Sequence, residues 1–138
     1  MANYGSNVDI KEGSLSEIMK QFSDVVEADV LMVSRQVGKK VAEDTVKRLK
    51  ADTKAKFKGK RYSMGWKAQS MGDGEWIVYN ATQPSLTHLL EHGHDVVRHG
   101  RVVGRTKGVP HMKPAEQQAI QDYYEETVKE INRRLSEL

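Results

Sequence analysis

The sequence predicts an α+β domain, and three patterns lead to that fold class. Apolar residues recur at helical spacing over a long N-terminal stretch and again after Pro114, towards the C-terminus. Between these stretches, two short segments alternate apolar and polar residues, as half-buried strands do. The 138 residues suit a single domain, so we expect one domain over residues 1–138.

The first expected element is a long helix that begins near Ser14 and runs to about Ala51. Residues 1–13 are polar and are expected to form a flexible arm. Ser14 and Glu17 then have the spacing of a capping box, which satisfies free backbone N–H groups at a helix start. The apolar positions that follow at helical spacing are Leu15, Ile18, Phe22, Val25, Val26, Val30, Val33, Val37, Val41, Val46 and Leu49.

This helix is longer than the domain that must cover it. At ~1.5 Å per residue it spans roughly 57 Å, whereas a compact chain of this length is about 37 Å across. The helix must therefore bend, with Gly38 as the best position, or project at one end. A projecting amphipathic end needs a partner for its apolar stripe. Val33 and Val37 are therefore the candidate residues for an interface between copies of the chain.

A small antiparallel sheet is expected after a basic connector at residues 52–61. Its first strand shows apolar residues at alternate positions, and residues 76–79 form the returning strand. Residues 71–74 (Met-Gly-Asp-Gly) form the turn between them, because glycine tolerates positive φ angles. We expect the aromatic residues of this sheet in the core, covered by the long helix. The alternating apolar positions of the first strand are Tyr62, Met64, Trp66 and Ala68.

A short helix, a docking loop and a closing helix complete the expected fold. The short helix covers residues 86–92, and Gly93 follows its end, as glycine often does. Residues 94–109 are rich in glycine and arginine and are expected to be a flexible loop that orders on docking. His99-Gly100 lies between two valine pairs and could turn a hairpin there. Pro114 then suits the first turn of the C-terminal helix.

The net charge of +3 hides an uneven distribution. Residues 52–70 carry six basic residues and one acidic residue, and residues 93–115 carry five and one, whereas residues 116–138 carry three and six. Basic segments can face nucleic acid or an acidic protein surface, or they can be solvated loops. The basic residues of the docking loop, which we expect to face a partner or a DNA channel, are Arg98, Arg101, Arg105 and Lys107.

Several classes of function lack their signatures in this sequence. The chain contains no cysteine, so it has no disulfide framework and no thiol chemistry. No apolar run approaches the ~20 residues that span a bilayer, and the N-terminus lacks the apolar core of a signal peptide. Phosphate-binding, dinucleotide-binding and nucleophile-elbow motifs are absent. We therefore expect no membrane association, no cofactor and no enzymatic activity.

One catalytic motif does occur. His88-Leu-Leu-Glu91-His92 spells H-x-x-E-H, the signature of inverted zinc metallopeptidases. On a helix the two histidines share one face as zinc ligands should, and Glu91 would be the general base. However, the helix ends at Gly93, and little chain follows to build a cleft and the supporting carboxylates. We expect no metal site, and a zinc metallopeptidase remains a remote alternative.

The runs HLLEHGH and GVPHMKPAEQQA, separated by the Arg/Gly loop, resemble a known family. They are similar to the head–tail joining, or tail-completion, family of siphovirus neck proteins. In that family a Leu-Glu-x-Gly turn precedes a variable loop and a Pro-x-x-x-Pro-Ala entry into the C-terminal helix. The match covers about thirty residues, and the matching positions are Leu90, Glu91, Gly93, Pro110, Pro114 and Ala115.

This resemblance implies a virion structural protein of a tailed phage. It implies a homo-oligomeric ring of six or twelve copies in the neck, between the head connector and the tail tube or terminator proteins. DNA would pass through the ring without sequence specificity, and the protein would be in the host cytoplasm during assembly. Glu91 would then satisfy backbone groups or basic side chains near the loop. A small nucleic-acid-binding module that uses the two basic segments is the alternative function.

Overall fold

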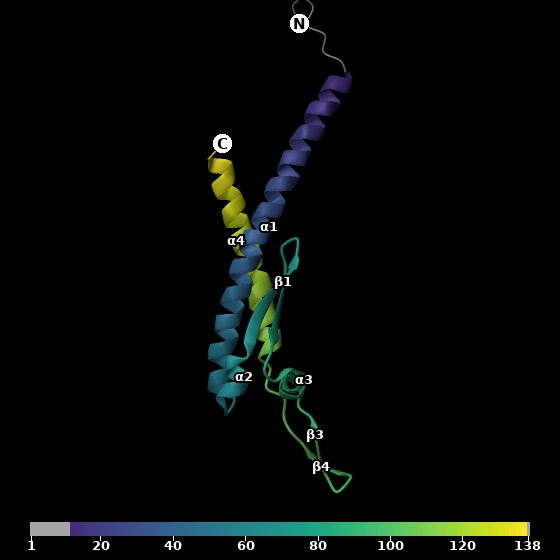
Figure 1. Cartoon of the computed structure of the whole chain (residues 1–138), viewed down its shortest axis with the longest axis vertical. Helices are drawn as coiled ribbons and strands as arrows, with labels where there is room; N and C mark the ends of the chain where they lie inside the picture. Colours follow the sequence, from purple (N-terminus) through teal and green to yellow (C-terminus); the bar gives the residue numbers. More distant parts are fainter. Residues whose placement is uncertain (1–11, 138) are drawn as a thin grey trace, which may run out of the picture.

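The computed structural model describes residues 12–137, without the side chains of residues 12–15, 18, 22 and 25 (Figure 1). The arm expected at residues 1–13 lies almost entirely outside the described residues. The predicted α+β fold is confirmed. In chain order the elements are α1 (Glu12–Lys56), α2 (Lys60–Met64), β1 (Trp66–Gly72), β2 (Glu75–Asn80), α3 (Pro84–His92), β3 (Asp95–Arg98), β4 (Arg101–Arg105) and α4 (Met112–Ser136).

Helix α1 is the longest element, with 45 residues. At ~1.5 Å per residue it spans about 67 Å. It runs through Gly38 as one helix, and its N-terminal part projects beyond all the other labelled elements (Figure 1). Of the two solutions expected for such a long helix, the structure therefore shows a projecting end. The capping box predicted at Ser14 and Glu17 is wrong, because both residues already lie inside the helix.

Helix α4 runs antiparallel to α1 and covers part of its apolar stripe (Figure 1). Val33 and Val37 are only 2% and 6% exposed, so both belong to the core of a single chain. The prediction that they form an interface between copies is wrong, because α4 already covers the stripe at these positions. The residues that pack in this contact are Val33, Val37 and Val41 on α1 and Ala119, Tyr123 and Ile131 on α4.

Strands β1 and β2 form the first of two separate two-stranded antiparallel sheets. The predicted turn is confirmed, and its residues Gly72, Asp73 and Gly74 all have positive φ angles. This turn lies against α1 at Gly38, where a Cβ atom would be only 2.7 Å from the carbonyl oxygen of Gly74. Glycine at position 38 therefore allows a close approach of the sheet to the helix.

The strand predicted to begin at Tyr62 begins four residues later, at Trp66. Residues 60–64 form the short helix α2 instead. Tyr62 and Trp66 are buried, while Met64 between them is 66% exposed. Positions i and i+4 share a face of a helix, so the two aromatic residues fit a helical turn as well as an alternating strand. Both rings pack with Leu49 and Ala115, whereas Met64, which an alternating strand would bury beside them, is exposed.

Strands β3 and β4 form a second antiparallel pair inside the segment predicted as a docking loop. The turn suggested at His99-Gly100 is confirmed, and its φ angles of 52° and 74° suit a two-residue hairpin turn. This hairpin projects from the end of the molecule opposite to the N-terminus of α1 (Figure 1). Its predicted mobility stays a prediction. Among the helices described in residues 12–137, none has the length and hydropathy needed to cross a bilayer.

Candidate functional site

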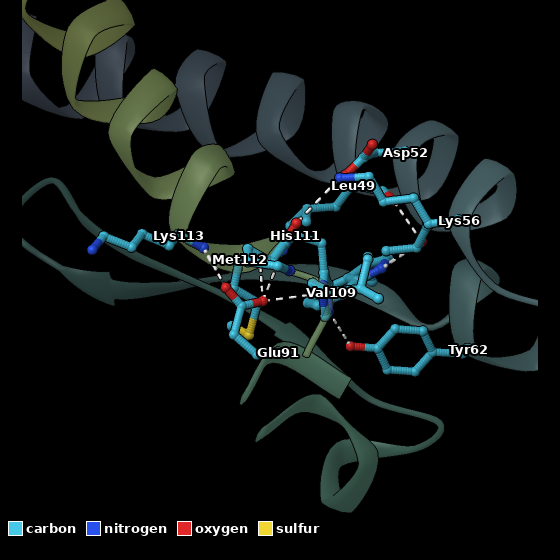
Figure 2. A network of polar contacts seen from close by, with 12 residues as sticks. Leu49, Asp52, Lys56, Tyr62, Glu91, Val109, His111, Met112 and Lys113 are labelled. Carbon is cyan, nitrogen blue, oxygen red and sulfur yellow. Dashed lines mark hydrogen bonds and ion pairs between the residues drawn. The ribbon is translucent and has the colours of Figure 1, made fainter. Parts of the chain in front are cut away.

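The candidate site is the junction where α3 meets the start of α4. Glu91, in the last turn of α3, is buried, and its carboxylate accepts three backbone N–H groups (Figure 2). Its Oε1 lies 2.8 Å from the nitrogen of His111 and 2.8 Å from that of Met112, and its Oε2 lies 3.1 Å from that of Lys113. The first N–H groups of a helix have no partner within it and carry partial positive charge. Glu91 therefore caps α4 from another helix.

This environment holds Glu91 in its charged form. Burial alone would raise the pKa of Glu91, because it removes water from the carboxylate. The three backbone N–H groups and the nearby His111 outweigh that effect and hold the pKa of Glu91 below its ordinary value. The charge is also favourable at a helix N-terminus. Glu91 thus satisfies backbone groups, which is one of the two roles that the family resemblance implied.

Two glycines allow the chain to cross itself beside Glu91. Gly93 ends α3 with a φ of 78°, and a Cβ atom there would overlap the carbonyl oxygen of Thr106. A Cβ atom on Gly108 would lie 2.6 Å from the carbonyl oxygen of Glu91. The segments that enter and leave the hairpin are therefore held in backbone contact at its base. A side chain at either glycine would force them apart.

His111 lies buried at the centre of the junction, 1% exposed. Its Nδ1 is 2.8 Å from the carbonyl oxygen of Val109, which can only accept, so Nδ1 carries a proton. Its Nε2 is 2.6 Å from the hydroxyl of Tyr62. Burial raises the pKa of Tyr62, so this hydroxyl keeps its proton and forms a buried hydrogen bond with Nε2 of His111. The ring of Phe57 packs edge-on against His111, with the centroids 5.1 Å apart.

The remaining positions of the family motif lie in the same junction. The carbonyl of Leu90 accepts an N–H from the end of the hairpin segment at 2.8 Å. The carbonyl of Pro110 accepts a bond from Nζ of Lys56 at 3.1 Å, which ties α1 to the start of α4 (Figure 2). Pro114 lies in the first turn of α4, as predicted, and Ala115 is buried. The structure thus brings all six predicted positions together.

The glutamate of the H-x-x-E-H motif is engaged in capping α4. His88 and His92 share a face of α3, with ring centroids 4.7 Å apart, as the helical spacing predicts. Glu91 points instead towards α4, and both of its oxygens accept backbone N–H groups (Figure 2). It is therefore not free to act as a general base. Within residues 12–137, no three histidine, cysteine or acidic side chains come together as a metal ion requires.

The four predicted docking residues divide between the tip and the base of the hairpin. Arg98 and Arg101 are directly opposite each other beside the turn, and both are exposed. Arg105 lies nearer the base, where its guanidinium pairs with Asp95 at 3.1 Å. Lys107 is exposed after the last strand residue. The tip therefore presents two arginines to solvent, and one arginine stabilises the hairpin itself.

The second basic segment lies towards the same end of the molecule. The C-terminal end of α1 and helix α2 are on the side of the molecule from which the hairpin projects (Figure 1). Lys56 is engaged there by Asp52 and by the carbonyl of Pro110. Besides Lys56, the exposed basic residues of this segment are Lys54, Lys58, Lys60, Arg61 and Lys67. The two basic segments of the sequence therefore occupy one end of the fold.

Sequence reasoning missed two residues that organise the junction. Asn80 is 3% exposed; its amide donates to the carbonyl of Tyr62 at 2.7 Å and accepts the N–H of Gln83 at 2.9 Å. An asparagine at the end of a strand, shortly before a proline, is a turn signal that could have indicated it. His111 had no comparable signal, because its partners Tyr62 and Glu91 are distant in the sequence.

No protein-family model matches the chain, and no curated protein or solved structure is significantly similar to it. Function is therefore inferred from the residues and geometry of the molecule.

Proposed function

We propose that this chain is a structural protein of a tailed-phage virion, part of the neck ring that joins the DNA-filled head to the tail. The junction around Glu91 is the observation that carries this proposal. The six positions that resemble the neck-family motif lie at this one junction, where Glu91 and Ala115 are buried, although they are spread from Leu90 to Ala115 in the sequence. The variable segment between them is the projecting hairpin. A fixed base with a projecting hairpin suits a protein that docks onto neighbours.

The geometry also supports a non-catalytic role. Glu91 is the best candidate for acid–base chemistry, and it caps a helix. An apolar groove of about 440 Å³ lies between α1, β2 and α4, and Glu116 and Tyr123 are the ionisable residues among the described ones that line it. An active site needs several polar groups that converge on a substrate. This groove lacks such a group of residues and suits a packing surface better.

The exposed surface of the chain favours assembly. The N-terminal part of α1 and the β3–β4 hairpin both project from the packed part of the chain (Figure 1). Apolar residues contribute to the exposed surface at both ends of the molecule, including Val26 of α1 and Val102 of β4, which are 44% and 63% exposed. A ring would remove much of this apolar surface from water.

Immunogold electron microscopy of purified phage particles tests the proposed location. An antibody raised against the full chain is expected to label the junction between head and tail. Particles that lack the protein, or that carry the label elsewhere, would contradict the neck assignment. Free tails and free heads from the same preparation serve as internal references, because they show on which side the protein remains attached.

A nucleic-acid-binding module is the second candidate, favoured by the gathering of both basic segments at one end. Such a protein would bind duplex DNA as a monomer through contacts to phosphates. Its affinity would then fall steeply with salt, because each neutralised phosphate contributes about −0.9 to the slope of log K against log salt concentration. Fluorescence anisotropy with a DNA duplex at several salt concentrations separates the two candidates. A neck ring that only lets DNA pass is expected to bind it weakly.

A further inference from the structure

Two apolar surfaces at opposite ends of the molecule lack cover from the rest of the described chain. The first is the α1 arm, defined here as residues 16–32, which projects beyond α4 (Figure 1). On the arm, Met19 is 60%, Val26 is 44% and Val30 is 51% exposed. The second is the β3–β4 hairpin, where Val97, Val102 and Val103 are 57% to 63% exposed.

The arm extends the same apolar face of α1 that α4 buries further along the helix. Val26 and Val30 are seven residues before Val33 and Val37, and positions seven apart share one face of a helix. Val33 and Val37 are buried under α4. The apolar stripe therefore continues onto the arm, but α4 ends beside the start of the arm. Arg134, close to the C-terminal end of α4, lies 3.8 Å from Asp29. The exposed part of this apolar stripe therefore needs a binding partner other than α4.

The hairpin also has an exposed apolar face. Val97 and Val102 are directly opposite each other in the strand pair, so their side chains lie on the same face. The register shifts between Val96 and Val97, which leaves Val103 as an extra residue in β4. Arg98 and Arg101 form the next opposite pair, which points to the other face beside the turn. The hairpin therefore presents valines on one face and, beside the turn, two arginines on the other.

The charges of the two surfaces are complementary. Residues 16–32 carry four acidic residues and one basic residue, whereas residues 95–107 carry four basic residues and one acidic residue. The charged side chains of both surfaces are exposed. In the arm they are Glu17, Asp24, Glu27 and Asp29, with Lys20. In the hairpin they are Arg98, Arg101, Arg105 and Lys107, with Asp95.

We propose that the hairpin of one copy docks on the α1 arm of the next copy. The two surfaces lie at opposite ends of one chain (Figure 1), so they meet only between chains. Pairing of arm with arm or of hairpin with hairpin would bring like charges together, which is costly at an interface. A contact between two different surfaces of identical chains is head-to-tail, and it closes into a ring when the rotation allows. The inference rests on the proposed neck ring and names its contact.

Site-directed cross-linking tests this contact without background, because the chain contains no cysteine. The full-length Val26→Cys and Val102→Cys proteins are mixed, treated with a short bismaleimide and resolved by mass. We expect the Val26–Val102 heterodimer to be the main product, well above either homodimer. Gln69→Cys, at an exposed position on β1 away from both surfaces, replaces Val102→Cys as the control and is expected to give little product.

Charge reversal provides a second variant set. Asp24→Lys with Glu27→Lys in the arm, or Arg98→Glu with Arg101→Glu in the hairpin, is expected to lower the cross-linking yield about tenfold or more. Mixing the two charge-reversed proteins restores opposite charges across one contact and is expected to recover the yield between them. These exposed substitutions leave the packed core in place, so folding is checked by circular dichroism alone.

The mass of the assembly, measured on the same proteins by analytical ultracentrifugation, distinguishes failure of the proposed contact from failure of the proposed ring. Oligomers with a dominant Val26–Val102 link support both. Oligomers that link Val26 to Val26, or that give no link at either position, overturn hairpin docking and leave a ring with another contact. A protein that stays monomeric and unlinked at every concentration overturns both proposals.

Discussion

The carboxylate of Glu91, at the end of α3, accepts the backbone N–H of His111, at the start of α4, at 2.8 Å. The backbone N–H groups of Met112 and Lys113 donate to the same carboxylate. Glu91, at the end of α3, therefore caps the N-terminus of α4, although the whole docking segment separates the two in the sequence. The position of the hairpin base therefore depends on one buried charge. The first two predictions address that charge.

Glu91→Gln is expected to lower the free energy of unfolding by about 1–3 kcal/mol, because buried N–H groups then lose charged acceptors. The amide keeps the shape of the carboxylate, but its nitrogen cannot accept the N–H of Lys113 or of its neighbours. Chemical denaturation monitored by circular dichroism measures the change. Glu116→Gln, at an exposed position in the second turn of α4, is the matched control and is expected to change stability by less than about 0.5 kcal/mol. Equal effects of the two variants would show that Glu91 is no special cap.

The free energy of unfolding is expected to fall at acid pH because Glu91 becomes protonated. The pKa of Glu91 is lower in the folded chain than its ordinary value of 4.5, so the folded state binds its proton less readily than the unfolded state. Its contribution is therefore fully present above about pH 4.5 and is lost as the pH falls through the folded pKa, below 4.5. Glu130, whose side chain is 22% exposed, has a pKa of about 2 because Arg133 bonds to it, and it titrates in the same direction.

Unfolding measurements between pH 7 and pH 3 on wild type and Glu91→Gln isolate the part due to Glu91. The difference in stability between the two proteins is expected to shrink as the pH falls below 4.5. A difference that stays constant over this range would contradict a charged Glu91 in the folded state.

Gly93→Ala is expected to destabilise the junction by about 2 kcal/mol or more, because its φ is positive and its Cβ would overlap a carbonyl oxygen. Gly104→Ala is the matched control within the hairpin, since its Cβ would meet no atom within 4 Å. Thermal unfolding is expected to separate the two variants by several degrees. If both melt at the same temperature, the crossing at Gly93 is not required for the fold.

Val33→Asp is expected to prevent folding, whereas Val26→Asp is expected to impair assembly only. Val33 is 2% exposed, so an unpaired charge there is expected to cost about 3 kcal/mol or more and to unfold the monomer. Val26 is 44% exposed on the arm, so Val26→Asp is expected to fold normally and to assemble poorly. Circular dichroism reports the fold, and analytical ultracentrifugation reports the assembly. A folded Val26→Asp protein that assembles like wild type would remove the arm from the interface.

The two long helices, α1 and α4, were predictable from sequence because their apolar periodicity is long and regular, and Gly93 marked the end of α3 correctly. The start of the sheet was not, because Tyr62 and Trp66 are four residues apart and fit both a helical and an alternating pattern. The His99-Gly100 turn was suggested by the valine pairs around it. These local features depend on neighbouring residues, which the sequence contains directly.

Long-range partners were harder to predict. The residues of the candidate junction were identified by their resemblance to a family motif, but the bonds from Glu91 to the start of α4 follow only from the packing of two helices. The same holds for Val33 and Val37. The apolar stripe showed that something covers α1, whereas the position of α4 decides which part is core and which part stays exposed.

The central claim is that this chain joins heads to tails through its projecting hairpin. The most direct measurement replaces residues 96–104 by an Asn-Gly turn in the phage gene, which keeps the Asp95–Arg105 pair and the junction around Glu91, and examines the lysate by electron microscopy. We predict DNA-filled heads and complete tails that are not joined, while the purified variant folds like wild type. Normal numbers of joined, infectious particles would contradict the account.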